Sequence, residues 1–188
     1  MIKQTFGLKD SEFIRGDVPM TKEEVRVISI SKLALAIDDT VLDIGAGTGS
    51  ISIECARVIE GQVYAIERNP SAVELLHRNK EKFGTHNLQI IEGLAPDDLP
   101  EAEVNKIIIG GSGGRMHEIF TAIEKYPVRK IVINTITLEN STKAVEQLKA
   151  FNYKDIEVVS VNIAKSKLVG NVTMMMGQNP INIITGAK

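Results

Sequence analysis

The stretch VLDIGAGTGS, residues 41–50, carries the strongest signal for the fold. An apolar run ends just after Asp43. Gly45, Gly47 and Gly49 then alternate with small residues before a helical pattern begins. Glycine allows a loop to adopt positive φ or a ligand to lie against bare backbone, and a helix that follows offers free N–H groups. The stretch therefore predicts a strand, a ligand-binding turn and a helix in succession.

Six further strand-like runs follow this stretch, at 62–67, 88–93, 105–111, 129–136, 155–164 and 181–186. Several are continuously apolar, which is typical of strands covered on both faces. Helical patterns separate most of them, whereas the last two have only a Gly- and Met-containing stretch (165–180) between them. The pattern predicts an α/β, Rossmann-like fold with a mostly parallel seven-stranded sheet and an antiparallel last strand.

Two of the helical patterns carry end signals. In TKEEVRVISISKLAL, Thr21 is a candidate N-cap with Glu24 three residues further on. In NPSAVELLHRNKEKFG, the opening Asn-Pro-Ser and the closing Gly84 predict a helix between them.

The composition limits the classes of protein to which this chain can belong. The chain has 188 residues, a formal net charge of −2 and 43% hydrophobic residues, which predicts one globular domain over 1–188 with an N-terminal extension over 1–20. The charge balance argues against a nucleic-acid-binding protein, and no run is long enough to cross a membrane. A single cysteine and the absence of a leader pattern predict a cytoplasmic protein without a cysteine metal site.

The glycine turn discriminates between two cofactor classes. A dinucleotide fold prefers G-x-G-x-x-G, which would require glycine at Ser50. The observed G-x-G-x-G preceded by Asp43 resembles motif I of class I S-adenosylmethionine-dependent methyltransferases. Glu67 at the end of the second strand is placed to accept both ribose hydroxyls, and Ala95, in the loop after the third strand, matches the position beside the adenine. The cofactor residues predicted from this pattern are Asp43, Gly45, Ala46, Gly47, Thr48, Gly49, Glu67 and Ala95.

The loop after the fourth strand, within IIIGGSGGR at 107–115, bears on the methyl acceptor. It has neither the proline nor the aromatic residue of the box that many amino-methylating enzymes carry there. A glycine-rich loop leaves space for a large flat acceptor close to the backbone. The predicted acceptor residues are Gly111, Ser112, Gly113 and Arg115.

Four segments together resemble one family. PMTKEEVR (19–26), LDIGAGTGS (42–50), IIIGGSGG (107–114) and NPINIITG (179–186) are similar, in order and spacing, to the decarboxylating precorrin methyltransferases of cobalamin biosynthesis. The resemblance implies methylation of carbon 15 of a tetrapyrrole with loss of CO₂ from the ring C acetate. It also implies S-adenosylmethionine as cofactor, Thr21 as a further cofactor contact, a homotetramer, and functional pairing with a separate C(5)-methyltransferase, whose domain this chain lacks.

The remaining candidates are less specific. A polycarboxylate acceptor needs a locally basic site, for which the candidates are Lys22, Arg26, Arg115, Lys165 and Lys167. His77, His86 and His117 are predicted to be solvated surface residues and Cys55 a small core residue. Met174–Met176 are predicted either to pack in the core or to form an oligomer contact. No catalytic side chain and no metal cluster is identified.

Two alternatives stay open at this level. The first is a class I methyltransferase that acts on RNA or another small molecule, although a pI of 6.0 and the absence of Trp argue against an RNA-stacking surface. The second is an NAD-binding or non-catalytic nucleotide-binding protein, which Ser50 disfavours.

Overall fold

The computed structural model describes residues 7–188, so residues 1–6 of the predicted N-terminal extension lie outside the described part. The helices are the short 3-10 helix η1 (Asp10–Glu12), α1 (Glu23–Leu33), α2 (Ser50–Val58), α3 (Pro70–Phe83), α4 (Met116–Ile123) and α5 (Leu138–Ala150). The strands are β1 (Val41–Ile44), β2 (Val63–Glu67), β3 (Leu88–Glu92), β4 (Lys106–Ile109), β5 (Lys130–Thr135), β6 (Lys154–Val161), β7 (Ala164–Val169), β8 (Val172–Gly177) and β9 (Ile181–Ala187).

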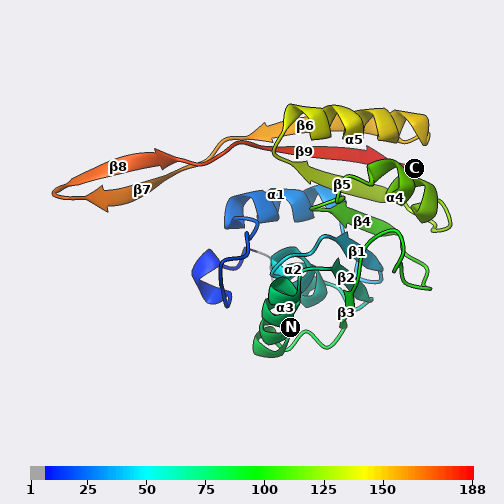
Figure 1. The fold of residues 1–188 in the computed structure, drawn as a ribbon, viewed down its shortest axis with the longest axis horizontal. Helices are drawn as coiled ribbons and strands as arrows, with labels where there is room; N and C mark the ends of the chain where they lie inside the picture. Colours follow the sequence, from blue (N-terminus) through cyan, green and yellow to red (C-terminus); the bar gives the residue numbers. More distant parts are fainter. Residues whose placement is uncertain (1–6) are drawn as a thin grey trace.

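Seven strands form one sheet in the order β3-β2-β1-β4-β5-β9-β6 (Figure 1). The first five in this order pair parallel, and β9 pairs antiparallel with both β5 and β6. The predicted mostly parallel sheet with an antiparallel last strand is therefore confirmed. Strand order reverses between β1 and β4, and α/β sheets bind ligands beyond the carboxyl ends of the strands at such a switch point.

Helices cover both faces of the sheet, and β4 shows why residues 107–109 are all apolar. Ile107 and Ile109 pack into the core formed with α4 and α5, whereas Ile108 packs into the core formed with α1, α2 and α3. Successive side chains of a strand point to opposite faces. Consecutive strand positions that are buried on alternate faces are therefore apolar here.

Local end signals were reliable for α3 but not for α1. The Asn69 side chain accepts a hydrogen bond from the Ser71 N–H at 3.0 Å, and Gly84 ends α3 at φ +62°, so both predicted ends are confirmed. The predicted N-cap role of Thr21 is wrong, because α1 begins at Glu23, and the Glu23 N–H donates to Asp10 Oδ1 at 2.9 Å. The Thr21 carbonyl instead accepts a hydrogen bond from Arg26 Nη1 at 2.7 Å.

The N-terminal segment from residue 7 packs against the helices that carry the glycine loop. Phe13 and Met20 are buried in the core on the α1–α3 face. The Ile14 N–H donates to Asn79 Oδ1 at 2.7 Å, and Asn79 Nδ2 donates to the Ile14 carbonyl at 3.0 Å. These contacts hold the segment that runs on through residues 18–22 beside the glycine loop.

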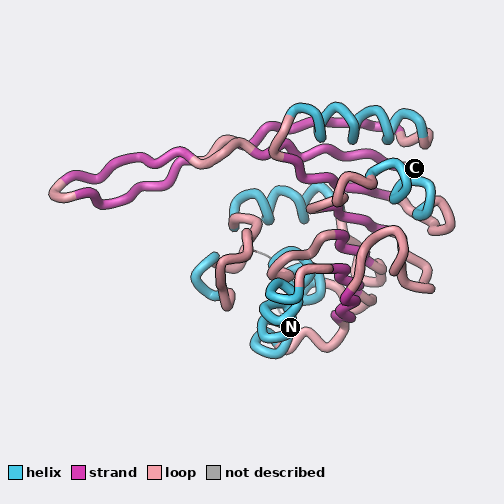
Figure 2. The backbone as a smooth tube through the Cα atoms, in the orientation of Figure 1, coloured by secondary structure: helices cyan, strands magenta, loops and turns pink. Residues whose placement is uncertain are grey.

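β7 and β8 form a two-stranded arm that projects away from the sheet (Figures 1 and 2). The side chains of Met174, Met175 and Met176 are 47%, 65% and 45% exposed. The expectation that they pack in the core of this chain is therefore wrong, because the arm leaves the body of the molecule and no layer formed by residues 7–188 covers it.

Candidate active site

The glycine loop between β1 and α2 contains glycines that serve different purposes. A Cβ at Gly49, where φ is +77°, would lie 1.9 Å from Leu76 Cδ1. The packing of α2 against α3 therefore requires glycine there. Gly47, at φ +56°, has only the Pro19 carbonyl oxygen nearby, 3.5 Å from where its Cβ would be. Gly47 borders a cavity, whereas Gly49 does not line either cavity described below.

Asp43 lies beneath this loop and also lines neither cavity. Its side chain is buried and accepts a hydrogen bond from Ser52 Oγ on α2. Burial raises the pKa of Asp43 to about 7, and the negative charge of Glu67 adds to the shift, while the Ser52 hydrogen bond opposes it. The structure therefore places Asp43 as a support that ties β1 to α2 below the ligand-facing surface.

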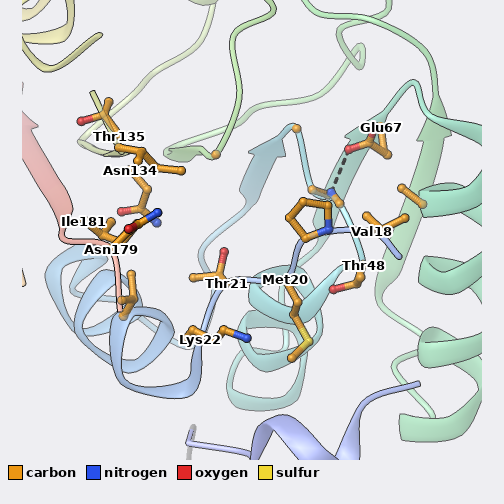
Figure 3. Close-up of a pocket in the computed structure, with 18 of the residues that line it drawn as sticks. Val18, Met20, Thr21, Lys22, Thr48, Glu67, Asn134, Thr135, Asn179 and Ile181 are labelled. Carbon is orange, nitrogen blue, oxygen red and sulfur yellow. Dashed lines mark hydrogen bonds between the residues drawn. The ribbon is translucent and has the colours of Figure 1, made fainter. Parts of the chain in front are cut away.

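Glu67 ends β2 and holds backbone N–H groups with both carboxylate oxygens. Oε2 accepts from the Gly47 N–H at 2.8 Å (dashed line in Figure 3). Oε1 accepts from the N–H groups of Arg68 at 2.9 Å and Asn69 at 2.8 Å. These bonds fix the carboxylate beside the glycine loop, as expected for a group that receives a ligand at the ends of β1 and β2.

A large cavity of about 640 Å³ opens at the carboxyl ends of the central strands. Figure 3 shows Asn134 and Asn179 on one side of it and Thr48 and Glu67 on the other, with Thr21 between them. Its walls come from the N-terminal segment, the glycine loop, the end of β5 and the base of the arm. The lining residues are Val18–Lys22, Val25, Gly45–Thr48, Glu67, Asn69, Ala72, Gly110, Asn134–Ile136, Ile163, Gln178, Asn179 and Ile181.

A smaller cavity of about 180 Å³ adjoins it, since Gly45 and Glu67 line both. Gly93, Leu94 and Ala95 from the loop after β3 line it on one side, and Gly111, Ser112 and Gly113 from the loop after β4 line it on the other. The predicted adenine position and most of the predicted acceptor loop therefore share one small cavity, and the large cavity is built mainly by other residues.

The predicted basic residues have different surroundings. Arg26 is fully buried, with Nε bound to Glu54, Nη1 3.2 Å from Asp10 and its guanidinium carbon 4.7 Å from the Phe13 ring centroid, so its prediction as an acceptor contact is wrong. Lys22 is half-buried and lines the large cavity.

The other three predicted cations line neither cavity. Arg115 forms a two-point ion pair with Asp97, and the Arg115 hydrogen bond is the main cause that lowers the pKa of Asp97. Lys165, at the base of the arm, pairs with Glu24 at 2.7 Å, and Lys167 is exposed on the arm.

Comparison with known proteins places this geometry in a family. The model of the precorrin methyltransferase domain matches residues 12–188. This chain belongs to the precorrin methyltransferase family. A relative from Sulfolobus acidocaldarius, 42% identical over 97% of each chain, is named "Probable cobalt-precorrin-6B C(15)-methyltransferase (decarboxylating)". One from Methanococcus vannielii with the same name is 41% identical over 96% of this chain and 99% of its own length.

Solved structures of precorrin methyltransferase relatives have the same fold. The precorrin-6Y C5,15-methyltransferase of Geobacter metallireducens GS-15 is 40% identical, covers 97% of this chain and 98% of its own, and superimposes with a TM-score of 0.89. The precorrin 8W decarboxylase of Methanobacterium thermoautotrophicum is 31% identical over 96% and 100% of the two chains, with a TM-score of 0.87. The predicted family, the class I methyltransferase fold and the assignment as a methyltransferase are confirmed.

Two walls of the large cavity in this precorrin methyltransferase were not predicted from the sequence. They are the end of β5, Asn134–Ile136, and the base of the arm, with Ile163, Gln178 and Asn179. One signal was available. Asn134 and Thr135 interrupt the apolar run at 129–136, at the carboxyl edge that the glycine loop also occupies.

The remaining predicted residues lie apart from both cavities. Cys55 is buried and unpaired, as predicted. His77, His86 and His117 are exposed, which confirms their surface assignment. Among residues 7–188, no group of three or more His, Cys, Asp or Glu is arranged to hold a metal ion, and no helix in that range is long and apolar enough to cross a membrane.

Proposed function

We propose that this chain transfers a methyl group from S-adenosylmethionine to carbon 15 of cobalt-precorrin-6B, with loss of CO₂ from the ring C acetate, in cobalamin biosynthesis. Named relatives support the reaction, since they match nearly the whole length of both chains at about 40% identity. The observation that carries the proposal is the pair of adjoining cavities that share Gly45 and Glu67. The methyl donor lies across this shared point, with its adenine in the small cavity and its remainder along the glycine loop, and the rest of the large cavity admits a second, larger molecule.

The residues around the shared point fit the methyl donor. The Glu67 carboxylate takes the ribose hydroxyls, and the small cavity beside Ala95 takes the adenine. Thr48 Oγ1 is buried and has no hydrogen-bond partner in the structure, so it is available to a polar ligand atom at the glycine loop. When bound, S-adenosylmethionine supplies a methyl group on a sulfonium, which is already activated for transfer to a carbon nucleophile.

The chain's own contribution to the reaction is to position the two reactants. Thr21 and Lys22 form one wall of the large cavity, and the glycine loop forms its floor beside Glu67. Two reactants that are held in line react as if one were present at a very high concentration, on the order of 10⁵ M or more. This alignment accounts for a large share of the rate of transfer. Lys22 supplies a positive charge for a carboxylate of the acceptor.

A calorimetric titration tests the cofactor assignment. S-adenosylmethionine and S-adenosylhomocysteine should each bind one site per chain, and NAD should not bind. Saturable NAD binding without S-adenosylmethionine binding would contradict the proposal and favour the dinucleotide alternative.

We also propose that the protein is a cytoplasmic homotetramer that works alongside a separate C(5)-methyltransferase. The arm supports self-association, because Leu168, Val172 and Met174–Met176 expose apolar side chains on two strands that no other part of residues 7–188 covers. Exposed apolar patches of this kind are typical of protein interfaces.

A further inference from the structure

The end of β5 forms a wall of the large cavity for which neither the family assignment nor the proposed function gives a role. Asn134, Thr135 and Ile136 all line the cavity. Figure 3 shows Asn134 on the side opposite Glu67 and Thr48. The inference drawn from this wall rests on the proposed function, because it concerns how the second molecule of the reaction is held.

The turn that follows β5 is fixed by side-chain hydrogen bonds. Thr135 Oγ1 lies 2.7 Å from Ser141 Oγ, which is 2.9 Å from the Thr137 carbonyl oxygen and accepts from Asn182 Nδ2 at 3.0 Å. Thr137 Oγ1 in turn accepts from the Asn140 N–H and caps α5. A turn tied to α5 and β9 in this way presents its side chains to the cavity in one arrangement.

Asn134 has one amide end fixed and the other free. Its Oδ1 lies 3.0 Å from Ser29 Oγ, a hydroxyl on α1 that is fully buried and is also 2.8 Å from the Val25 carbonyl oxygen. Its Nδ2 is buried and has no hydrogen-bond partner in the structure. A buried donor without a partner is costly in a folded protein, and such groups are rare unless they have a functional role. Asn134 lines the large cavity, so this donor lies next to a space that a ligand can occupy.

Ile136 gives the same wall an apolar rim. Its side chain is 66% exposed while it lines the cavity, and Leu138, two residues further on, is 76% exposed. Large apolar side chains exposed at a cavity mouth are suited to the flat face of an organic ligand. The wall therefore combines a neutral hydrogen-bond donor with apolar surface just beyond it.

We propose that the end of β5 is the acceptor-binding wall, in which Asn134 Nδ2 donates to a side-chain carboxylate of the macrocycle and Ile136 lies against its ring. The ligand chemistry this wall selects is a carboxylate on a flat apolar framework. Asn134 acts as a specificity residue for the acceptor and makes no contact with the methyl donor. Lys22 on the neighbouring wall attracts the carboxylates of the acceptor by its positive charge, whereas the Asn134 hydrogen bond fixes the orientation of one of them.

Two variants with one matched control test this assignment. Asn134→Asp keeps the size of the side chain and the acceptor for Ser29 but replaces the free donor with a negative oxygen. Asn140→Asp introduces the same charge on the exposed first turn of α5, outside the cavity. Ile136→Ser removes the apolar rim at an exposed site, where the fold is spared. Acceptor binding is measured by titrating cobalt-precorrin-6B, followed by its own absorption, into protein saturated with S-adenosylhomocysteine.

The expected result is at least a tenfold weaker affinity for cobalt-precorrin-6B in Asn134→Asp and a smaller loss in Ile136→Ser. S-adenosylhomocysteine affinity should stay within twofold in all three variants, and Asn140→Asp should match the unaltered protein. Unchanged acceptor affinity in Asn134→Asp, or an equal loss of S-adenosylhomocysteine affinity, would overturn the assignment while leaving the proposed function in place. Failure of the unaltered protein to bind cobalt-precorrin-6B would overturn both.

Discussion

The carboxylate of Glu67 accepts a hydrogen bond from the backbone N–H of Gly47, with 2.8 Å between Oε2 and the nitrogen. The bond joins the end of β2 to the loop after β1, so one acidic side chain orders the glycine loop and borders both cavities. A ligand that binds here must satisfy or replace this bond, which makes the cofactor site sensitive to changes at either residue.

Removal of the carboxylate in Glu67→Ala should weaken S-adenosylmethionine and S-adenosylhomocysteine equally, by about 2–3 kcal/mol, as is typical of hydrogen bonds to a charged group. The methyl group is not involved, so calorimetry should give the same loss for both ligands. Glu74→Ala, at an exposed position on α3, is the control and should bind both normally. A loss confined to the sulfonium form would contradict the ribose assignment.

A side chain at Gly47 should block the cofactor without unfolding the protein. Gly47→Val should lower S-adenosylmethionine affinity at least tenfold, about 1.4 kcal/mol. Gly84→Val is the control for backbone strain, since Gly84 at the end of α3 has φ +62°, close to the +56° of Gly47, and lines neither cavity. Both variants should lose similar stability in thermal unfolding. Equal affinity loss in both would show that strain, and not the cavity, is responsible.

Two of the glycines in the loop after β4, Gly113 and Gly114, should separate the effect of filling the small cavity from the effect of backbone strain. Gly113 lines the small cavity and Gly114 does not, although both have positive φ, +57° and +87°. Gly113→Leu should therefore reduce S-adenosylhomocysteine affinity, while Gly114→Leu should not. Normal cofactor binding together with lost turnover in Gly113→Leu would instead return this loop to the acceptor, as the sequence predicts.

Asp43 should make stability depend on pH in an unusual direction. Its pKa is about 7 in the folded protein and 3.8 as the unperturbed value. Between these values the folded state retains a proton that the unfolded state has lost, so stability falls as pH rises from about 4 to 7. Asp43→Asn should remove this loss, worth on the order of 2–4 kcal/mol at pH 7 and above. Denaturant unfolding measured at several pH values checks it, and an unchanged slope with pH would contradict the raised pKa.

Charge on the arm should break up the assembly. Leu168→Glu combined with Met175→Glu places two charges on side chains that are 70% and 65% exposed, so the chain's own fold is unaffected. Light scattering should report a tetramer for the unaltered protein and a smaller species for the variant. Ile37→Glu, an exposed apolar site outside the arm, should remain tetrameric. A variant that keeps the parent mass would exclude the arm as the contact.

The sequence predicted features that depend on local rules. Backbone geometry determines the glycine turn after β1 and the two ends of α3, at Asn69 and Gly84. Burial on both faces of the sheet determines the apolar runs. Both kinds of feature can be read from residues that are neighbours in the sequence. The arm also had a local signal, since Gly170-Asn171 is a two-residue turn between Leu168-Val169 and Val172, which have high strand propensity.

Features set by contacts between distant residues were not predictable in this way. Arg26 carries the charge of a surface residue, and only its bond to Glu54, 28 residues away, and its contacts with residues 8–21 bury it. The placement of the Gly111–Gly113 loop beside Ala95 likewise depends on how the loops after β3 and β4 meet. The role proposed for Asn134 depends likewise on distant contacts, because residues from several elements bury its amide and form the cavity beside it.

The mass of the product formed from cobalt-precorrin-6B tests the central claim most directly. The purified chain is incubated with S-adenosylmethionine carrying a ¹³C-labelled methyl group, and the tetrapyrrole is analysed by mass spectrometry and NMR. The proposed function predicts one product that has gained a labelled methyl group at carbon 15 and lost one CO₂. Return of the substrate unchanged, or a label on any other atom, would contradict it.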